Sequence, residues 1–449
     1  MIPPKPAARP DRVSLRKYVR LFRKDILSAQ PARLYRAWMA EFKTPFFRSF
    51  LVNQPDLVKT VLKDRPLDFP KSNRISEGLR PLLGNSVFLT NGAEWQKQRR
   101  IIDPAFEGGR LRETYPAMWA AAEAARDRLL AQAGQTIEIE AETSHAAADV
   151  IFRTLFSIPI EDATAQKVFH EFRSYQRSQP ILNLAAFIPL PRLFPRFFRK
   201  DTRATARRIR RLITDLTEAR QQAIAEGTAP NDLATKIMTT ADPETGETFS
   251  AQEMVDQVAI FFLAGHETSA SALAWALYLV ATNPEWQTRI AEEAQGLTGN
   301  FSDVSILKIS RDVFREALRL YPPVPMMVRE ASCPETFRNR PVPKGAQIVL
   351  SPWHLHRHER LWENPDGFDP ARWQTENGKT CGREAYIPFS AGARVCTGAG
   401  FAMVEGPLLL SLLLRDLKVV ALPERVPVPE AHLTVRTRDG IWLRLDKRA

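Results

Sequence analysis

The sequence has few of the features that mark secreted, membrane-spanning or nucleic-acid-binding proteins. Only three of its 449 residues are cysteines, which argues against a disulfide framework and favours a reducing compartment. It has no uninterrupted run of about 20 apolar residues that could anchor it in a membrane. Its basic first residues lack the apolar segment of a secretory signal. Zinc-finger spacing and RNA-binding signatures are also missing. We therefore expect a cytoplasmic protein that does not bind nucleic acid.

Linkers and internal repeats are missing as well. No low-complexity segment divides the chain, so we expect a single domain over residues 1–449. The one unusual bulk quantity is a net charge of +12. Basic residues are spread along the whole chain, which fits a solvated basic surface or a docking face for an acidic protein partner.

Helical periodicity dominates the sequence. A strand is expected at residues 48–53, and residues 94–238 are mostly helical in pattern. A long helix is expected from Ser250 to Asn283, because Ser250 and Glu253 form a capping box and Asn283-Pro284 supplies a stop. A helix of this length, apolar on several faces, must pass through the middle of the protein. A further helix at about 309–320 precedes short strands, so the fold class is mainly α (α+β).

A lone cysteine lies in a turn-prone stretch, "PFSAGARVCTG", at residues 388–398. Gly392 and Gly398 bracket Cys396, which suits a tight loop with backbone N–H groups turned inward. The apolar run that follows places Cys396 at a helix N-terminus, where the helix dipole favours a thiolate. Arg394 adds a positive charge nearby. These features favour an ionised thiolate over the buried free thiol that is the usual state of a cysteine.

Several kinds of site could use such a thiolate. A nucleophile would need a partner histidine, and His266, His354, His356 and His358 lie in no recognisable protease or transferase context. A zinc site would need more ligands, although His354, His356 and His358 alternate as on a strand. An axial thiolate on a haem iron needs no second protein ligand, because the porphyrin supplies four nitrogens.

The stretch resembles the haem-binding signature of the cytochrome P450 monooxygenases at Phe389, Gly392, Arg394, Cys396 and Gly398. The resemblance implies haem b (iron protoporphyrin IX) as cofactor and Cys396 as the ligand of its iron. It also implies that Arg394 contacts a haem propionate and that Phe389 shields the sulfur. The expected fold is a large helical lobe with a long central helix and a smaller β-rich lobe from about residues 1–90 and 325–385.

The middle of the long helix reads "AGHETS", residues 264–269. A mid-helix glycine costs about 1 kcal/mol relative to alanine, a cost that close approach of a flat ligand would offset. The segment resembles the oxygen-activation motif of the same family. The resemblance implies that Thr268 hydrogen-bonds the bound dioxygen and that Glu267 belongs to the proton-delivery route. Ala264 and Gly265 are expected to leave room for haem and dioxygen. His266 has no implied role.

Other charged residues complete the resemblance. Trp95 and Arg99, and also Arg329, are expected to contact haem propionates, for which a guanidinium is well shaped. Glu316 and Arg319 lie at i, i+3 in "REALRLYPPVP". The resemblance implies that Arg372 of "FDPARW" joins them in a buried triad that fixes the cysteine loop. All these motifs occur in the family's order.

The expected substrate is lipophilic, such as a terpenoid, carotenoid or fatty acid. The residues expected to line its pocket are apolar: Ile260, Phe261, Leu263, Ala264, Val324, Met326 and Met327. A late turn at residues 433–435 is expected to contribute as well. The aromatic and basic segment 185–200 is expected to be a packed loop or an access lip that contacts a membrane peripherally.

The expected reaction is hydroxylation or epoxidation with one oxygen atom of O2. The sequence has no Rossmann fingerprint for a nicotinamide or flavin, so electrons should come from a separate ferredoxin or flavodoxin with its NAD(P)H reductase. Lys97 and Arg100 are candidates for the docking face. A peroxide-using haem-thiolate enzyme and a non-catalytic haem-binding sensor remain as alternatives.

Overall fold

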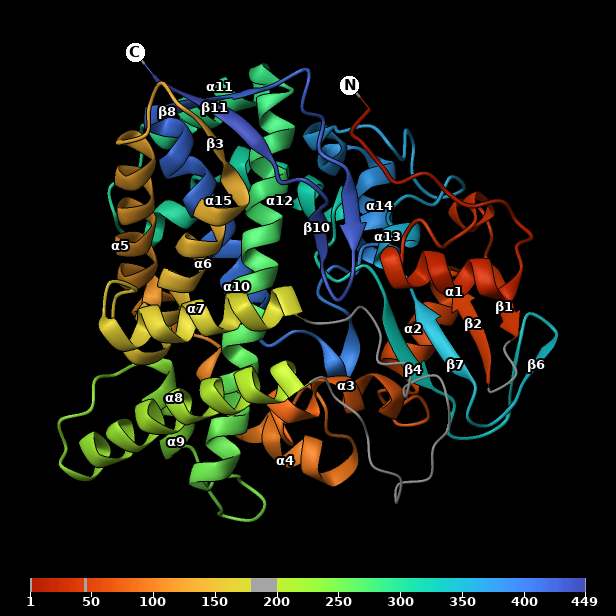
Figure 1. The fold of residues 1–449 in the computed structure, drawn as a ribbon, viewed down its shortest axis with the longest axis horizontal. Helices are drawn as coiled ribbons and strands as arrows, with labels where there is room; N and C mark the ends of the chain where they lie inside the picture. Colours follow the sequence, from red (N-terminus) through yellow and green to blue (C-terminus); the bar gives the residue numbers. More distant parts are fainter. Residues whose placement is uncertain (1, 44–46, 179–199, 449) are drawn as a thin grey trace. The chain divides into compact units, whose positions relative to one another are not determined.

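The computed structural model describes residues 2–43, 47–178 and 200–448. Figure 1 labels the helices and strands of the chain, which divides into two compact units. The first unit comprises residues 1–69, 122–146 and 267–449, and the second comprises residues 70–121 and 147–266. Helices α5 (Arg110–Leu130), α6 (Ile139–Phe156) and α10 (Ala251–Ala281) have residues in both.

The first unit carries the β-sheets. Its strands are β1 (Met39–Lys43), β2 (Arg48–Val52), β3 (Thr136–Glu138), β4 (Met327–Glu330), β5 (Glu335–Phe337), β6 (Arg340–Val342), β7 (Gln347–Leu350), β8 (Leu417–Ala421), β9 (Pro429–Ala431), β10 (Val435–Thr437) and β11 (Trp442–Lys447). Its own helices are α1 (Leu15–Lys24), α2 (Pro55–Lys59), α11 (Pro284–Ala294), α12 (Lys308–Leu320), α13 (Pro352–Leu355), α14 (Glu376–Glu384) and α15 (Ala399–Asp416).

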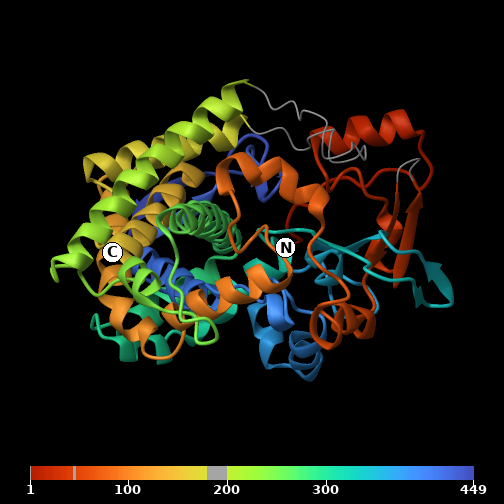
Figure 2. The same ribbon diagram turned by 90° about the horizontal axis from the view of Figure 1, so that it is seen from below.

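The second unit is helical over its described residues. Its own helices are α3 (Asn73–Leu83), α4 (Gly92–Ile102), α7 (Ala163–Ser178), α8 (Lys200–Ala225) and α9 (Leu233–Thr239). Helices α7 and α8 run side by side (Figure 2). The predictions of a strand at 48–53 and of helices at 250–283 and 309–320 are confirmed by β2, α10 and α12.

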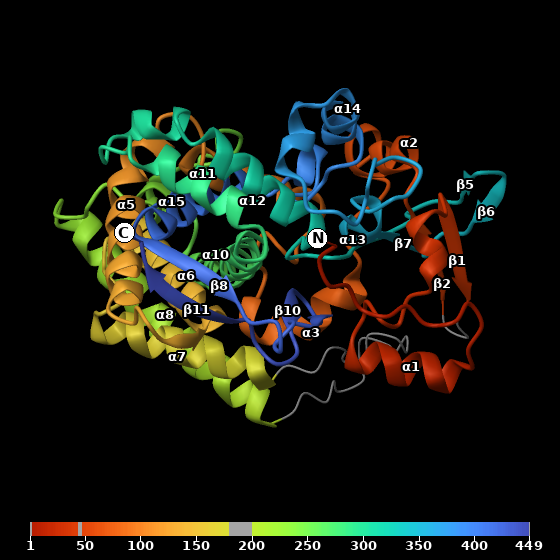
Figure 3. The same ribbon diagram turned by 90° about the horizontal axis from the view of Figure 1, so that it is seen from above.

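One described sheet has the strand order β1-β2-β7-β4. Strand β2 pairs with β7 in parallel, with Phe50 opposite Ile348, and β4 pairs with β7 in antiparallel orientation, with Arg329 opposite Ile348. In a separate sheet, β11 lies between β8 and β3, and its pairing with β8 is visible in Figure 3. Strands β9 and β10 form a hairpin of their own.

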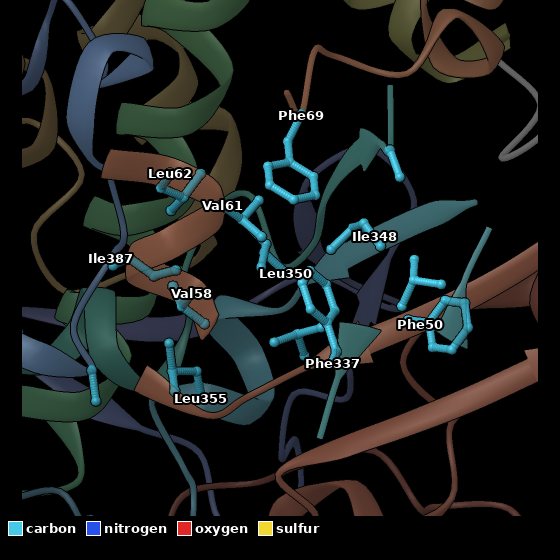
Figure 4. Close-up of a cluster of buried hydrophobic side chains, with 14 of the residues drawn as sticks. Phe50, Val58, Val61, Leu62, Phe69, Phe337, Ile348, Leu350, Leu355 and Ile387 are labelled. Atoms are coloured by element: carbon cyan, nitrogen blue, oxygen red, sulfur yellow. The ribbon is translucent and has the colours of Figure 1, made fainter. Parts of the chain in front are cut away.

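A hydrophobic core fixes α2 and the turn of π-helix after it, Thr60–Asp64, to the first of these sheets. Val58, Val61 and Leu62 from this segment pack with Ile348 and Leu350 of β7 (Figure 4). Each is at most 3% exposed, and burying one such side chain contributes roughly 1.5–3 kcal/mol. The core therefore gives the backbone at Leu62–Pro66 a fixed position, which matters for the cysteine loop.

Helix α10 begins as its sequence predicts. The backbone N–H of Glu253 donates to Ser250 Oγ at 3.3 Å, and the N–H of Ser250 donates to Glu253 Oε2 at 2.9 Å. These two bonds form a capping box. In the first unit, Trp275 of this helix stacks on Tyr321 with ring centroids 3.8 Å apart. Among the described residues, no helix is long and apolar enough to cross a membrane.

Candidate active site

Cys396 lies between a short 3-10 turn, Gly392–Arg394, and helix α15. Its N–H donates to the carbonyl of Phe389 at 2.9 Å, and its own carbonyl accepts from the N–H of Ala399 at 3.3 Å. Its side chain is exposed. Cys381, by contrast, is buried, and burial raises the pKa of its thiol to about 11. The thiol before α15 is thus accessible in this unit, whereas that of Cys381 is held protonated.

Gly392 is the residue that lets the cysteine loop pack against the core. Its φ of 65° lies in the left-handed region, which only glycine adopts without strain. A Cβ at this position would also lie 2.0 Å from the carbonyl oxygen of Leu62. A Cβ at Gly398 would lie 3.9 Å from Cys396 Sγ, an ordinary contact. Gly392 therefore sets the loop, whereas nothing in the protein's own packing requires glycine at position 398.

Two arginines near the cysteine have charges that affect one another. Arg394 Nη1 donates to the carbonyl of Pro66 at 2.5 Å. Arg329, on β4, is 7% exposed, and burial together with the charge of Arg394 lowers its pKa to about 10. In the described part of the chain, Arg329 has no carboxylate at ion-pair distance, and its Nη1 donates to the carbonyl of Val328 at 3.3 Å. A buried cation in such surroundings needs an anion, and a haem propionate fits this requirement.

Trp95 and Arg99 lie on α4 in the second unit. Trp95 is buried, and the Arg99 guanidinium lies 5.9 Å from its ring centroid. Arg99 also donates through Nε to Asp103 Oδ2 at 2.9 Å. Burial raises the pKa of Asp103, while Arg99 opposes that rise. Arg99 thus already has an acidic neighbour one turn along the chain, which the sequence interpretation overlooked.

The first half of the "AGHETS" segment belongs to the second unit. Ala264 is exposed, whereas His266 is buried and meets Phe169 edge-on at 5.4 Å. A Cβ at Gly265 would lie 2.4 Å from Ile151 Cδ1 of α6. The space left by Gly265 is therefore taken by a neighbouring helix. Close helix packing therefore offsets the cost of the glycine, and the expectation that Gly265 leaves room for haem stays a prediction.

The second half of the segment belongs to the first unit, where it carries several polar contacts. Glu267 accepts hydrogen bonds from Thr434 Oγ1 and from the Arg436 guanidinium, whose Nε lies 3.0 Å from Glu267 Oε1. Thr268, the next residue, is half-buried. Ser269 Oγ donates to Glu405 Oε2 at 3.1 Å. The sequence interpretation missed these partners because they lie more than 130 residues away along the chain.

Glu405 is a buried acid on α15, nine residues after Cys396. It is 4% exposed, and its Oε1 has no hydrogen-bond partner among the described residues. Burial raises its pKa to about 8, and the hydrogen bond from Ser269 opposes that rise. At neutral pH the side chain is therefore mostly a protonated carboxylic acid.

The three charged residues expected to form a triad lie together in the first unit. Arg319 donates through Nε and Nη2 to the two oxygens of Glu316 at 2.9 and 2.8 Å, and Arg372 Nε donates to Glu316 Oε1 at 2.9 Å. Exposure is 0% for Glu316 and Arg319 and 4% for Arg372. Both guanidiniums also bind backbone carbonyls, those of Pro365 and Gly367 among them.

The alternating histidines do not lie on a strand, so the zinc interpretation is wrong in its premise. His354 belongs to α13, and His356 and His358 lie in the turns after it. All three are buried, and burial lowers their pKa values to about 3, 3 and 4. No cluster of three metal-ligating side chains occurs among the described residues.

The expected pocket residues divide between the units. In the second unit, Ile260 and Leu263 are buried, and Phe261 meets Phe106 with ring centroids 5.6 Å apart. In the first unit, Val324, Met326 and Met327 are partly buried, and Met327 also packs against the sheet core. The expected access lip at 185–200 lies outside the described residues, apart from Lys200 at the start of α8.

Comparison with known proteins settles the class. A family model described as cytochrome P450 matches residues 39–443. Cyclooctat-9-en-7-ol 5-monooxygenase of Streptomyces melanosporofaciens is 33% identical over 377 residues, which is 81% of this chain and 78% of the relative. Cytochrome P450 4A14 of Rattus norvegicus is 31% identical over 436 residues, 91% of this chain and 83% of the relative.

The fold agrees with this assignment. The crystal structure of the cytochrome P450DA heme domain matches with a TM-score of 0.80 at 24% identity, covering 99% of this chain and 98% of that one. The chain belongs to the cytochrome P450 family, as its motifs predict. It is a cytochrome P450 monooxygenase with the α+β fold of that family, and its cofactor is haem b, bound through a cysteine thiolate.

The Glu405 acid should give stability a specific pH dependence. Its pKa is about 8 in the folded protein and about 4.3 in an unfolded chain. The folded state therefore holds the proton more tightly, and this group's contribution is lost as pH rises from about 4.5 to 8, by up to about 1.4 kcal/mol per pH unit. We expect Glu405→Gln to gain stability relative to the parent protein as pH rises from 5 to 8.5.

Thermal unfolding of both proteins across this pH range measures the effect. The exposed Glu424 provides the control, since Glu424→Gln should follow the parent at every pH. A stability difference between Glu405→Gln and the parent that does not change with pH would show that Glu405 does not titrate as stated.

The triad should be costly to break. Arg372→Met removes one of the cations from a buried carboxylate, and we expect urea unfolding to show a loss of about 3–5 kcal/mol. Lys379→Met is the matched control. Lys379 pairs with Glu376 on the exposed surface of α14, where an ion pair contributes about 0–1 kcal/mol. Equal losses in the two variants would contradict the assignment.

Proposed function

We propose that this protein uses Cys396 as the thiolate ligand of its haem and oxygenates a lipophilic substrate. The observation that carries the proposal is the accessible Cys396 at the start of α15, with the cations Arg394 and Arg329 in the same unit. The thiolate supplies the iron ligand, and the two cations suit the anionic propionates. Trp95 and Arg99 of α4 are proposed as further propionate contacts, Phe389 as the shield of the sulfur, and Ala264 as a contact of haem and dioxygen.

The haem activates dioxygen once electrons are supplied. The overall reaction, RH + O2 + 2 e⁻ + 2 H⁺ → ROH + H2O, consumes two protons for each substrate oxygenated. We propose that Glu267 belongs to the proton-delivery route, taking protons from solvent and passing them on one at a time, and that the Thr268 hydroxyl donates a hydrogen bond to dioxygen. Glu267 is only 8% exposed, so it can carry a proton where bulk water is largely excluded.

The proposed substrate is an oily molecule such as a terpenoid, carotenoid or fatty acid. The apolar residues Ile260, Phe261, Leu263, Val324, Met326 and Met327 support this class, and methionines give a pocket wall that adapts to irregular shapes. The name of the relative from Streptomyces melanosporofaciens gives cyclooctat-9-en-7-ol as its substrate. Such an unsaturated alcohol is consistent with a lipophilic substrate here.

We propose that a separate ferredoxin or flavodoxin, with its NAD(P)H reductase, supplies the electrons. Lys97 and Arg100 are poorer docking candidates than the sequence suggested. Lys97 Nζ binds Glu247 at 2.6 Å, and Arg100 binds Asp242 through two nitrogens at 2.6 and 2.8 Å. These carboxylates neutralise the charges that an acidic partner would need, so the docking face is proposed to lie elsewhere on the protein.

We further propose that the chain works as one domain in the cytoplasm, in keeping with its few cysteines. Membership of a monooxygenase family counts against the two alternatives, a peroxide-using enzyme and a non-catalytic sensor. Neither alternative needs protons delivered to dioxygen, so neither explains why Glu267 and Thr268 occur together.

The thiolate assignment predicts a spectrum. The reduced, CO-bound protein should show the red-shifted Soret band of haem-thiolate proteins, and Cys396→His should keep haem but move the band to an unshifted position. Cys333→Ser, at a half-buried cysteine, is the control and should retain the shifted band. An unshifted band in the parent protein with haem bound would rule out thiolate ligation.

A further inference from the structure

Side chains on both elements fasten the hairpin of β9 and β10 to helix α10. Arg436 of β10 and the preceding Thr434 both donate to Glu267 Oε1. One turn further along α10, Ser271 Oγ donates to the carbonyl of Val435 at 2.6 Å. Three consecutive residues of the hairpin are therefore fixed to α10. All of these residues belong to the first unit.

The contact is built from largely buried groups. Thr434, Ser271 and Glu267 are 4%, 7% and 8% exposed, whereas the Arg436 side chain keeps 39% of its surface accessible. A carboxylate in this setting is held in place by charge-assisted hydrogen bonds, which are stronger than neutral ones. The orientation of the Glu267 carboxylate is thus set by the hairpin as well as by its own helix.

The other end of β10 is fixed to a second helix. The Thr437 N–H donates to Glu140 Oε1 at 3.2 Å, and Thr437 Oγ1 donates to Glu140 Oε2 at 2.8 Å. Burial raises the pKa of Glu140 on α6 to about 7, while the charge of Arg436 opposes that rise. Arg436 therefore interacts with two carboxyl groups: it hydrogen-bonds to the buried Glu267, and its charge acts on the partly buried Glu140.

We propose that Arg436, aided by Thr434, is a positioning residue for Glu267, and that it holds the carboxylate where proton transfer to dioxygen requires it. This inference rests on the proposed role of Glu267. The hairpin also carries Leu433, a large apolar side chain that is 40% exposed, within the turn expected to contact substrate. A shift of Leu433 on contact with substrate would therefore also move Thr434, the next residue, which hydrogen-bonds to Glu267.

If Glu267 is no longer held in position, more of the electrons taken from NADPH should end in hydrogen peroxide and fewer in oxygenated substrate. When protons are not delivered to complete oxygenation, the two electrons can leave as hydrogen peroxide, O2 + 2 e⁻ + 2 H⁺ → H2O2. The substrate is then released unchanged. The proposal therefore predicts slower turnover with a larger peroxide share, while substrate affinity changes little.

Arg438, directly after β10, provides a matched control. It lies two residues after Arg436 and pairs with Glu430 of β9 within the hairpin. Arg438→Gln removes an equal charge from the same hairpin without removing a hydrogen bond to α10. Neither Arg438 nor Glu430 has a place in the proposed active site.

The experiment compares Arg436→Gln, Arg436→Lys, Arg438→Gln, Glu267→Gln and the double variant Arg436→Gln/Glu267→Gln as haem-loaded proteins. The assay uses dodecanoic acid as the probe substrate, a [2Fe–2S] ferredoxin and its NADPH reductase. For Arg436→Gln we expect kcat for NADPH oxidation to fall about tenfold with KM within about twofold, and the peroxide share to rise. Arg436→Lys should recover part of the loss, and Arg438→Gln should match the parent.

The double variant tests whether Arg436 acts through Glu267. If it does, adding Arg436→Gln to Glu267→Gln should cause no further loss. Hydrogen exchange of the peptide 429–437 gives a readout independent of turnover. Exchange in this peptide should be about tenfold faster in each of the single variants Arg436→Gln and Glu267→Gln than in the parent protein. It should be unchanged in Arg438→Gln.

The outcomes separate the two claims. If Glu267→Gln matches the parent in kcat and peroxide share, the role of Glu267 in proton delivery is wrong, and the inference falls with it. If Glu267→Gln is impaired but Arg436→Gln matches the parent, only the inference is wrong. Equal losses in Arg436→Gln and Arg438→Gln, or additive losses in the double variant, would also overturn it.

Discussion

The first unit depends on one buried carboxylate, that of Glu316. An ionised carboxyl group without exposure to water is unstable unless its charge is compensated and its oxygens accept hydrogen bonds. Arg319 and Arg372 meet both needs, and their remaining N–H groups bind backbone carbonyls between His356 and Gly367. These hydrogen bonds hold the backbone of residues 356–367 against the two arginines that pair with Glu316. The segment that leads to the cysteine loop is attached to this backbone, because the His356 ring accepts a hydrogen bond from the N–H of Ile387 at 2.9 Å. Ile387 lies two residues before Phe389, whose carbonyl holds the N–H of Cys396.

This connection gives the buried histidines a physical role. To accept from Ile387, the His356 ring must be neutral with Nε2 unprotonated. Burial lowers its pKa to about 3, so the ring meets this condition at any pH near neutrality. Arg319 binds the backbone carbonyl of the same residue at 2.9 Å. One histidine thus joins the triad to the loop that carries the proposed haem ligand. To bind a metal ion together, His354, His356 and His358 would have to leave the buried positions that they occupy.

Sequence patterns predicted those parts of the molecule whose signals are local. The capping box at Ser250 and the apolar run after Cys396 each lie within a few residues of the structure they specify, so α10 and α15 could be predicted. The contacts of Glu267 with Arg436 and of Ser269 with Glu405 could not, because only tertiary packing brings these residues together. Spacing alone misled at His354–His358, where alternation also fits a turn. A mid-helix glycine such as Gly265 does not by itself indicate a ligand, since it can also let a neighbouring helix such as α6 pack closely.

The pairing of Lys97 and Arg100 with nearby carboxylates also changes the meaning of the net charge. The value of +12 counts every ionisable group equally, but an approaching protein responds to the local electrostatic potential, which opposite charges a few ångströms apart largely cancel. Asp242, Glu244 and Glu247 all lie on the segment that leads into α10, and all three bind cations of α4. The three carboxylates outnumber the two cations that they bind, so this surface offers no net positive charge to an acidic partner. Long-range attraction of an acidic protein must originate from cations elsewhere on the molecule.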